Sequence, residues 1–351
     1  MRRRWRWAGA TTLGLAGVGY GLVTHLEAPP HAGPPSDHFD GERFENVPPM
    51  PPRDPAGVAR WLTEPREAWP EWVAAPAGPA PPRRVTTGVR VTLVNHATLL
   101  IQLGGLNVLT DPIWSERASP FGWLGPRRHR APGVPLEALP PIDAVLISHN
   151  HYDHLDVATL ARLIARDHPR VLAGLGTARL LARAGLDPRQ VTDLDWWQAQ
   201  ALGPATITFT PAQHWSSRSL TDRRRTLWGS FHLRAGAQAA YFAGDTGLGP
   251  HFGTIRARLG APDVALLPIG AYAPRWMMRP QHMDPTEAVT AHRALGARQA
   301  VAMHWGTFRL SNEGIDAPPR ALEAAARAAG LAPAAFRVLQ AGEALAVAPV
   351  P

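Results

Sequence analysis

The chain of 351 residues contains no cysteine and no lysine. Without cysteine there is no disulfide, no thiolate nucleophile and no cysteine-ligated zinc site. A transition metal would therefore have to be held by histidine and carboxylate side chains. The absence of cysteine does not identify the compartment, because such a chain is compatible with either redox state.

Acidic residues are scarce relative to basic ones, which leaves a net charge of +8. Every basic side chain is an arginine, and Arg2, Arg3, Arg4 and Arg6 contribute half of the excess. A strongly basic chain would ordinarily suggest binding to nucleic acid. Here the excess is concentrated at one end, beside an apolar run, and that placement favours targeting to a membrane.

The apolar run covers residues 7–26 and is long enough, at about 20 residues, to span a bilayer. No convincing cleavage site follows it, because Ala28 is followed by Pro29 and Pro30. We therefore expect residues 1–27 to be a secretory signal or an uncleaved anchor, with the folded domain periplasmic or otherwise outside the cytoplasm. A disordered basic tail is the alternative interpretation.

Residues 28–84 are rich in proline, which fixes φ and removes backbone donors. This composition predicts an extended arm with at most one short helix. Aromatic residues such as Trp61 and Trp69 interrupt the proline-rich sequence, and they suggest that the arm lies on the folded domain. That domain is expected to comprise residues 85–351.

From residue 85 onward, short apolar runs alternate with segments of helical periodicity, which predicts an α/β layered domain. The run 144–147 is entirely apolar, as expected of a strand that is buried on both faces. Strands are expected at 89–94, 99–103, 107–110, 144–147, 206–210, 239–242, 264–268 and 299–303, and helices at 156–167, 177–184, 285–295 and 319–329.

The clearest chemical signal follows the strand 144–147. Three histidines and one carboxylate occur within six residues, namely His149, His151, Asp153 and His154. One short loop of this kind can serve two metals about 3.5–4 Å apart. Imidazole and carboxylate suit Zn²⁺, and Mn²⁺ or Fe²⁺ would accept the same ligands. The alternative is a set of incidental solvated or core histidines.

This His-x-His-x-Asp-His pattern resembles the metallo-β-lactamase superfamily, which implies a four-layer αβ/βα sandwich. The resemblance directs the search for further ligands to His214, Asp245 and His304, each of which lies just past an apolar strand. Asp111 resembles the first-motif aspartate of the superfamily, which orients ligand histidines. A plain turn before Pro112 is the alternative role for Asp111.

The resemblance also implies how the ligands are shared between two Zn²⁺ ions. One ion would be held by three histidines, the other by one aspartate and two histidines, and one further aspartate would bridge the two. The first set is His149, His151 and His214, the second is Asp153, His154 and His304, and the bridging residue is Asp245. With a bridging hydroxide the site keeps a small positive charge, which attracts a monoanionic phosphodiester and makes hydroxide available at neutral pH.

The segments 110–120, 125–128, 139–149, 281–285 and 303–308 resemble a narrower family, the N-acylphosphatidylethanolamine-hydrolysing phospholipases D. This resemblance implies cleavage of the lipid phosphodiester on the headgroup side, with release of N-acylethanolamine and phosphatidic acid. Residues 1–27, 28–84 and 85–351 would then be the signal or anchor segment, the arm and the hydrolase domain.

The expected catalytic residues are Asp153 and His282. His282 matches a family histidine near the metal pocket and could stabilise or protonate the leaving alkoxide; a structural role at the start of a helix is equally compatible with its position. His96 also matches the family, but the sequence indicates no role for it.

Several aromatic residues in loop-like segments could line an acyl-chain groove or a membrane-facing rim, although a core role is expected for at least half of them. These residues are Trp123, Trp215, Trp228, Tyr272 and Trp276.

The expected partners are a phospholipid substrate and a membrane surface, with no nucleic acid and with a homodimer left open. Two other functions compete. One is a hydrolase of the same fold that acts on a lactone, a sugar phosphate or a β-lactam. The other is a nuclease or nucleic-acid binder, which the cluster Arg223-Arg224-Arg225 suggests.

Overall fold

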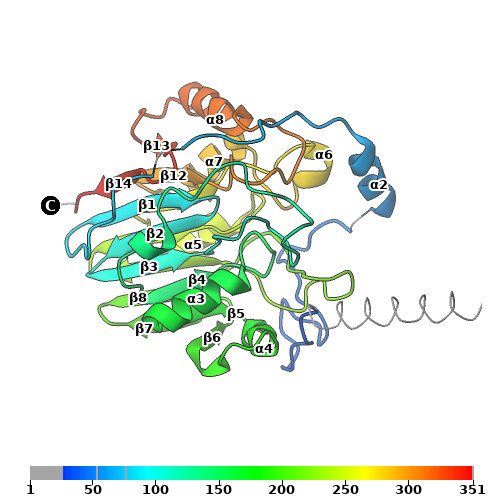
Figure 1. The fold of residues 1–351 in the computed structure, drawn as a ribbon, viewed down its shortest axis with the longest axis horizontal. Coiled ribbons are helices and arrows are strands. Elements are labelled where there is room, and N and C mark those ends of the chain that lie inside the picture. Colours follow the sequence, from blue (N-terminus) through cyan, green and yellow to red (C-terminus); the bar gives the residue numbers. More distant parts are fainter. Residues whose placement is uncertain (1–26, 53, 76, 350–351) are drawn as a thin grey trace, which may run out of the picture.

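The computed structural model describes residues 27–52, 54–75 and 77–349 (Figure 1). The predicted signal or anchor segment, except for Glu27, lies outside the described residues. Within the described part of the chain, no helix combines the length and the apolar character needed to cross a bilayer.

Two seven-stranded mixed sheets form the centre of the molecule (Figure 1). The first has the order β14-β1-β2-β3-β4-β5-β6 and the second the order β13-β12-β11-β10-β9-β8-β7. The strands of the first sheet are β1 (Val89–Asn95), β2 (Thr98–Leu103), β3 (Leu106–Thr110), β4 (Ala144–Ile147), β5 (Arg170–Gly174), β6 (Val191–Leu194) and β14 (Ala344–Val347). Those of the second are β7 (Ala199–Leu202), β8 (Ala205–Thr210), β9 (Ser230–Ala235), β10 (Gln238–Phe242), β11 (Val264–Pro268), β12 (Gln299–Met303) and β13 (Phe336–Arg337).

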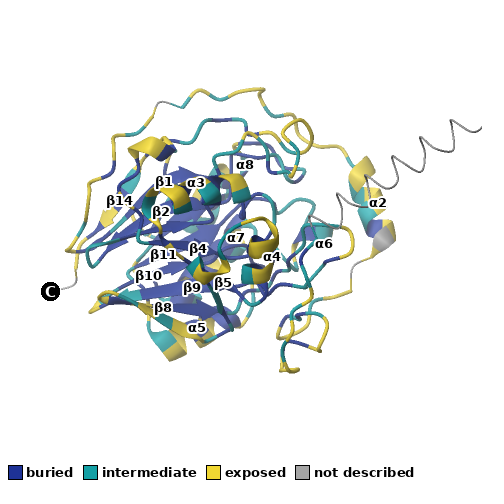
Figure 2. Cartoon of the chain, turned by 60° about the horizontal axis from the view of Figure 1, so that its bottom comes forward, coloured by how far each residue is buried: buried dark blue, intermediate teal, exposed yellow. Residues whose placement is uncertain are grey.

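Helices cover the outer face of each sheet, which confirms the predicted four-layer αβ/βα sandwich. Helices α3 (Val157–Asp167) and α4 (Thr177–Arg183) pack on the first sheet. Helices α5 (His251–Leu259), α7 (Pro285–Leu295) and α8 (Ala317–Ala328) pack on the second. Two further helices are α2 (Pro55–Thr63) in the arm and α6 (Arg275–Met278). Buried residues are concentrated in the strands (Figure 2).

Strand β4 shows how the apolar pattern builds these layers. Its side chains alternate between the two faces of the sheet. Ala144 and Leu146 join the core between the two sheets, whereas Val145 and Ile147 pack toward α3 and α4. All four residues are buried, as the apolar run predicted.

The structure contains elements that the sequence analysis did not place. Strand β7 was missed because its residues are exposed or half-buried and carry no strong apolar signal. Helix α5 was missed because it lacks a side-chain N-cap and follows Pro250. Other unplaced strands are β5, β6, β9, β13 and β14.

The arm lies on the domain, as its aromatic residues predicted, and contains the short helix α2 (Figure 1). Trp61 Nε1 donates a hydrogen bond to Asn312 Oδ1 at 3.0 Å, and Trp69 Nε1 donates to the peptide oxygen of Glu313 at 2.9 Å. These contacts tie the arm to the loop that precedes α8.

Candidate metal centre

The seven predicted ligands lie on loops at one edge of the sandwich. Strands β3, β4, β5 and β6 run parallel to one another, and so do β10, β11 and β12. The carboxyl ends of parallel strands meet at one edge, where open α/β sheets place their ligands. The ligand loops follow β4, β8, β10 and β12.

Three histidines form the first group of the centre. His149 Nε2 lies 2.8 Å from His151 Nδ1, which in turn lies 3.3 Å from His214 Nε2. These three atoms are near enough to one another to share one ion. This is the set that the sequence assigned to the first metal.

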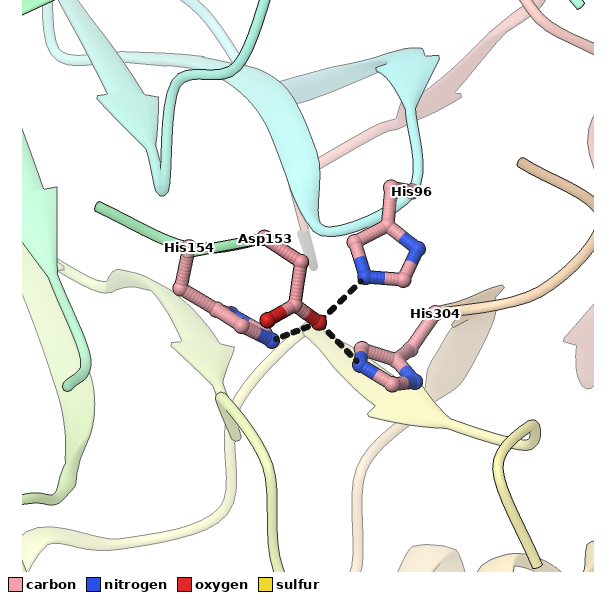
Figure 3. A group of neighbouring side chains, drawn as sticks. All are labelled: His96, Asp153, His154 and His304. Atoms are coloured by element: carbon pink, nitrogen blue, oxygen red, sulfur yellow. Dashed lines mark hydrogen bonds and ion pairs between the residues drawn. The ribbon is translucent and has the colours of Figure 1, made fainter. Parts of the chain in front are cut away.

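Asp153, His154 and His304 lie together in the second group, which also includes His96 (Figure 3). Asp153 Oδ2 lies 3.2 Å from His154 Nε2 and 3.4 Å from His304 Nε2. All three side chains are at most 12% exposed. The structure therefore brings together the residues assigned to the second metal.

Asp245 stands between the two groups. Its Oδ2 lies 3.2 Å from His154 Nε2 and 3.1 Å from His304 Nε2. The same oxygen lies 4.0 Å from His149 Nε2 and 3.8 Å from His214 Nε2. One carboxylate oxygen thus faces ligand atoms of both groups, which is the position of a bridging ligand.

Gly244 allows this close approach. Its φ is +58°, and a Cβ at this position would lie 2.6 Å from the Cβ of Ser148. A larger residue would push the end of β10 away from the loop that follows β4, because the left-handed conformation and the short distance both disfavour a side chain.

The chemistry of these residues fits divalent cations. His154 Nε2, His304 Nε2 and Asp245 Oδ1 are buried without hydrogen-bond partners among the described residues. Burial disfavours protonation of His304, but the carboxylates of Asp245 and Asp153 outweigh it and raise its pKa to about 9. The carboxylates thus attract positive charge to this cavity, and a divalent cation would displace the protons.

Asp111 has the orienting role that the resemblance implied. It lies at the end of β3, where its Oδ2 faces His154 Nδ1 at 2.6 Å and accepts a hydrogen bond from Ser148 Oγ at 2.5 Å. Its Oδ1 accepts from the peptide N–H of Ser148 at 2.7 Å. A carboxylate on Nδ1 fixes the ring of His154 so that Nε2 points into the centre.

Two further residues support the ligands, and sequence reasoning missed both. The side chain of Asn46, in the arm, accepts from the peptide N–H of His214 at 3.0 Å and donates to its oxygen at 2.8 Å. Arg218 donates to the peptide oxygens of Asn150 and Leu155 at 3.0 and 2.9 Å. Neither residue carries a sequence signal, because each acts on a loop far away in the chain.

His282 and His96 both lie at the centre. His282 Nδ1 lies 3.8 Å from Asp245 Oδ2 and has no hydrogen-bond partner among residues 27–52, 54–75 and 77–349. Burial lowers the pKa of His282 to about 4, so its ring is neutral at neutral pH. His96 Nε2 lies 3.0 Å from Asp153 Oδ2.

Two cavities adjoin the loops of the centre. The larger, of about 530 Å³, lies beside the loop that follows β4 and is lined among others by Arg117, Phe121, Tyr152, Leu155, Leu180 and Arg218. The smaller, of about 230 Å³, is lined by Met50, Val58, Trp215, Trp276, Met277 and Gln281, among others. Trp215 connects the smaller cavity to the centre, because its ring lies 4.3 Å from that of His151.

The expectation of a core role for at least half of the five aromatic residues is wrong. Only Trp228 is buried in the core. Trp123 and Trp276 are 75% and 44% exposed, and Trp215 and Tyr272 are half-buried. The loops that carry these residues run over the surface, so the aromatic rings have no sheet to pack against.

The chain is similar to proteins of known family and known structure. The model of the β-lactamase superfamily domain matches residues 106–305. An uncharacterized protein of Mycobacterium tuberculosis is 42% identical over 240 residues, which cover 67% of this chain and 63% of that protein. This chain therefore spans less than two thirds of the length of its mycobacterial relative.

Two other relatives carry a description of activity. N-acyl-phosphatidylethanolamine-hydrolyzing phospholipase D 1 of Caenorhabditis elegans is 36% identical over 244 residues, covering 67% of this chain and 68% of that protein. The solved structure of a metallo hydrolase from Ignicoccus hospitalis superposes with a TM-score of 0.57 at 26% identity, covering 74% of this chain and 98% of the other.

Proposed function

We propose that this chain, which belongs to the metallo-β-lactamase superfamily, is a zinc-dependent hydrolase, a phosphodiesterase of phospholipase D type. Its substrates are N-acylphosphatidylethanolamine-like lipids, which it hydrolyses to N-acylethanolamine and phosphatidic acid. The observation that carries the proposal is Asp245 Oδ2, which faces both groups of ligands within 4.0 Å. A pair of ions suits phosphodiester hydrolysis, because two metals can stabilise both the attacking and the leaving oxygen.

When bound, the two ions would polarise a phosphoryl oxygen and make hydroxide available at neutral pH. The residues of the chain supply the remaining functions. His149, His151 and His214 would hold one ion, and Asp153, His154 and His304 the other, with Asp245 between them.

His282 is the candidate for the residue that assists departure of the leaving group. Its ring is neutral because burial lowers its pKa, so one ring nitrogen carries a proton and the other does not. The N–H can donate a hydrogen bond to the ethanolamine oxygen as the P–O bond breaks. With no partner for Nδ1 in the described part of the protein, this nitrogen is available to substrate.

The lipid part of the proposal is supported by the smaller cavity and by the activity named for the nematode relative. Met50, Val58, Trp276 and Met277 give this cavity apolar walls suited to an acyl chain, and Trp215 places it beside His151.

A panel of substrates tests the proposal. Metal-loaded protein should release N-acylethanolamine from N-acylphosphatidylethanolamine vesicles, and Asp245→Asn protein should not. Headgroup release is measured by mass spectrometry beside a lactone and a sugar phosphate. Turnover of the lactone or the sugar phosphate, with the lipid left intact, would contradict the phospholipase activity. It would assign the protein another hydrolase activity of this fold.

The expected membrane surface and the extracytoplasmic location belong to the same proposal. Trp123 is 75% exposed and Leu220 is 98% exposed. Trp123 directly follows Gly122, and Leu220 lies two positions after Arg218; both Gly122 and Arg218 line the larger cavity. Exposed aromatic and aliphatic side chains beside a cavity are typical of surfaces that contact lipid. Residues 1–27 would then hold the domain at the bilayer.

A further inference from the structure

His96 has no part in the function proposed above, yet it contacts the metal centre. It lies in the turn between β1 and β2, is 3% exposed and has a φ of 46°. Its Nε2 is 3.0 Å from Asp153 Oδ2, and its peptide oxygen accepts from the N–H of His304 at 2.8 Å. Figure 3 shows the ring on the far side of Asp153 from His154. His96 thus touches two expected ligands of one metal.

The position of His96 differs from that of a ligand. His154 Nε2 and His304 Nε2 each lie within 3.4 Å of both Asp153 Oδ2 and Asp245 Oδ2. His96 pairs with Asp153 alone among the carboxylates of residues 27–52, 54–75 and 77–349. His96 Nε2 thus lies near the ligand atoms of Asp153, His154 and His304, but unlike the two other histidines it is set apart from the bridging carboxylate of Asp245.

We propose that His96 is a positioning residue that donates a hydrogen bond from Nε2 to Asp153 and thereby fixes the orientation of this carboxylate at the second metal. The proposal rests on the metal centre of the proposed function but not on its lipid substrate. On this proposal, the turn between β1 and β2 contributes a residue to the metal centre.

The protonation and the fixed position of the ring agree with this role. A carboxylate oxygen only accepts hydrogen bonds, so Nε2 of His96 is the donor in its contact with Asp153. Nε2 has an acceptor in Asp153, whereas Nδ1 has no hydrogen-bond partner in the part of the chain that the structure describes. The turn is held because the peptide N–H of His96 donates to Thr307 Oγ1 at 3.1 Å. The ring also meets the edge of Phe308 at 5.3 Å.

Loss of such a partner weakens metal binding without removing a ligand, typically by about 10–100-fold. His96→Asn deletes the bond, because the shorter amide occupies the place of Nδ1, and Asn tolerates a positive φ. His96→Gln is the matched restoring variant, because its amide nitrogen reaches the place of Nε2. The two variants therefore separate the hydrogen bond from the fold of the turn.

The test measures metal binding by the full chain, without any substrate. Zn²⁺ affinity is determined by competition with a chelator, and Co²⁺-loaded protein is examined by visible absorption. His96→Asn protein should still bind two ions at saturation, with one of them about 10–100-fold weaker. The Co²⁺ bands should keep their intensity, and His96→Gln should recover most of the affinity.

Two results would overturn the positioning role. Unchanged affinity in His96→Asn protein would show that the contact with Asp153 is without effect. A site that stays empty at saturating metal, with altered Co²⁺ bands, would make His96 a ligand. If wild-type protein itself bound no metal, the proposed function would fail as well. If wild-type protein bound metal but left the lipid intact, only the substrate assignment would fail.

Discussion

At the scale of single residues, Asp245 is expected to serve both groups of metal ligands. Its Oδ2 faces His154, His304, His149 and His214. Asp245→Asn keeps the shape but removes the charge that attracts both ions. We expect metal content to fall from about two ions to less than one, and activity to fall by more than the ~100-fold that loss of an outer partner costs.

Elemental analysis and turnover of the same preparation measure both effects. Asp316→Asn is the matched control, because this aspartate is exposed and contacts only Arg320 among charged groups of the described residues. Retention of two ions by Asp245→Asn protein would contradict the bridging assignment.

His282 is expected to act on the substrate rather than on the ions. His282→Asn should lower turnover by about 10²–10⁴-fold and leave two ions bound, because the seven other residues supply three ligands to each ion and the bridging carboxylate without it. Metal analysis beside steady-state kinetics distinguishes the roles. A variant that loses an ion together with its activity would show that His282 is a ligand.

The arginine cluster at 223–225 has internal contacts that the sequence did not suggest. Arg224 pairs with Glu45 of the arm, and Arg225 pairs with Glu27, the residue directly before the arm. Arg223 lies over the ring of Trp215, 3.7 Å from its centroid. Arg224 and Arg225 thus hold the beginning of the described chain on the domain. Arg223 instead packs on Trp215 in the wall of the smaller cavity.

At the scale of structural elements, the arm contributes to the metal centre through Asn46. Its amide makes two hydrogen bonds to the peptide of His214 and accepts a third from Trp228 Nε1 at 3.1 Å. Asn46→Ala leaves the buried N–H and oxygen of His214 unpaired, and each costs about 1–3 kcal/mol, whereas Trp228 Nε1 keeps the peptide oxygen of Ala212 as an acceptor. We expect the free energy of unfolding to fall by ~2 kcal/mol or more, and the ion held by His214 to bind about 10–100-fold more weakly.

Urea denaturation and chelator competition measure these two quantities. Asn312→Ala is the matched control, because Asn312 also holds the arm, through Trp61, but touches no metal ligand. Equal metal affinities in the two variants would refute the link between the arm and the centre.

The arm also carries a pH-dependent contact. His38 lies between two carboxylates, with Nδ1 2.6 Å from Asp37 Oδ1 and Nε2 2.7 Å from Asp195 Oδ1, and its ring stacks on Trp196. Burial opposes protonation, but the hydrogen bonds to Asp195 and Asp37 outweigh it and raise the pKa of His38 above 6.5.

A raised pKa stabilises the folded state below the unfolded pKa of about 6.5, and this stabilisation is lost as pH rises through the folded value. The melting temperature of metal-loaded protein should therefore fall more steeply between about pH 6 and 9 in wild type than in His38→Gln. His168→Asn is the control, because His168 is exposed in a left-handed helix cap that Asn tolerates. Parallel melting profiles for wild type and His38→Gln would exclude the effect.

At the scale of the whole molecule, membrane attachment is the property to test. The full chain should pellet with membranes and resist a high-salt wash, because apolar burial of residues 7–26 is insensitive to salt. Protein that begins at Glu27, which keeps the contacts of Glu27 to Arg225, should remain largely in the supernatant. Equal distribution of both proteins in the soluble fraction would rule out an anchor.

The sequence by itself determined the chemistry of the centre and the class of fold. Four expected ligands lie within six residues of one loop, and a family resemblance pointed to the other three, each within four residues of the end of an apolar strand. The apolar run of β4 likewise predicted a strand that is buried on both faces. These features are local in the chain, and periodicity records local burial.

Apart from Asp111, only the tertiary structure decided which residues support the ligands. Asn46 reaches His214 across 168 positions, Arg218 reaches Asn150 across 68, and His96 reaches Asp153 across 57. Such contacts leave no mark on composition or periodicity, because each depends on two loops that meet only when the sheets pack together. When the two sheets pack together, these loops meet at one edge. There the turn between β1 and β2 and the proline-rich arm contact the candidate metal ligands.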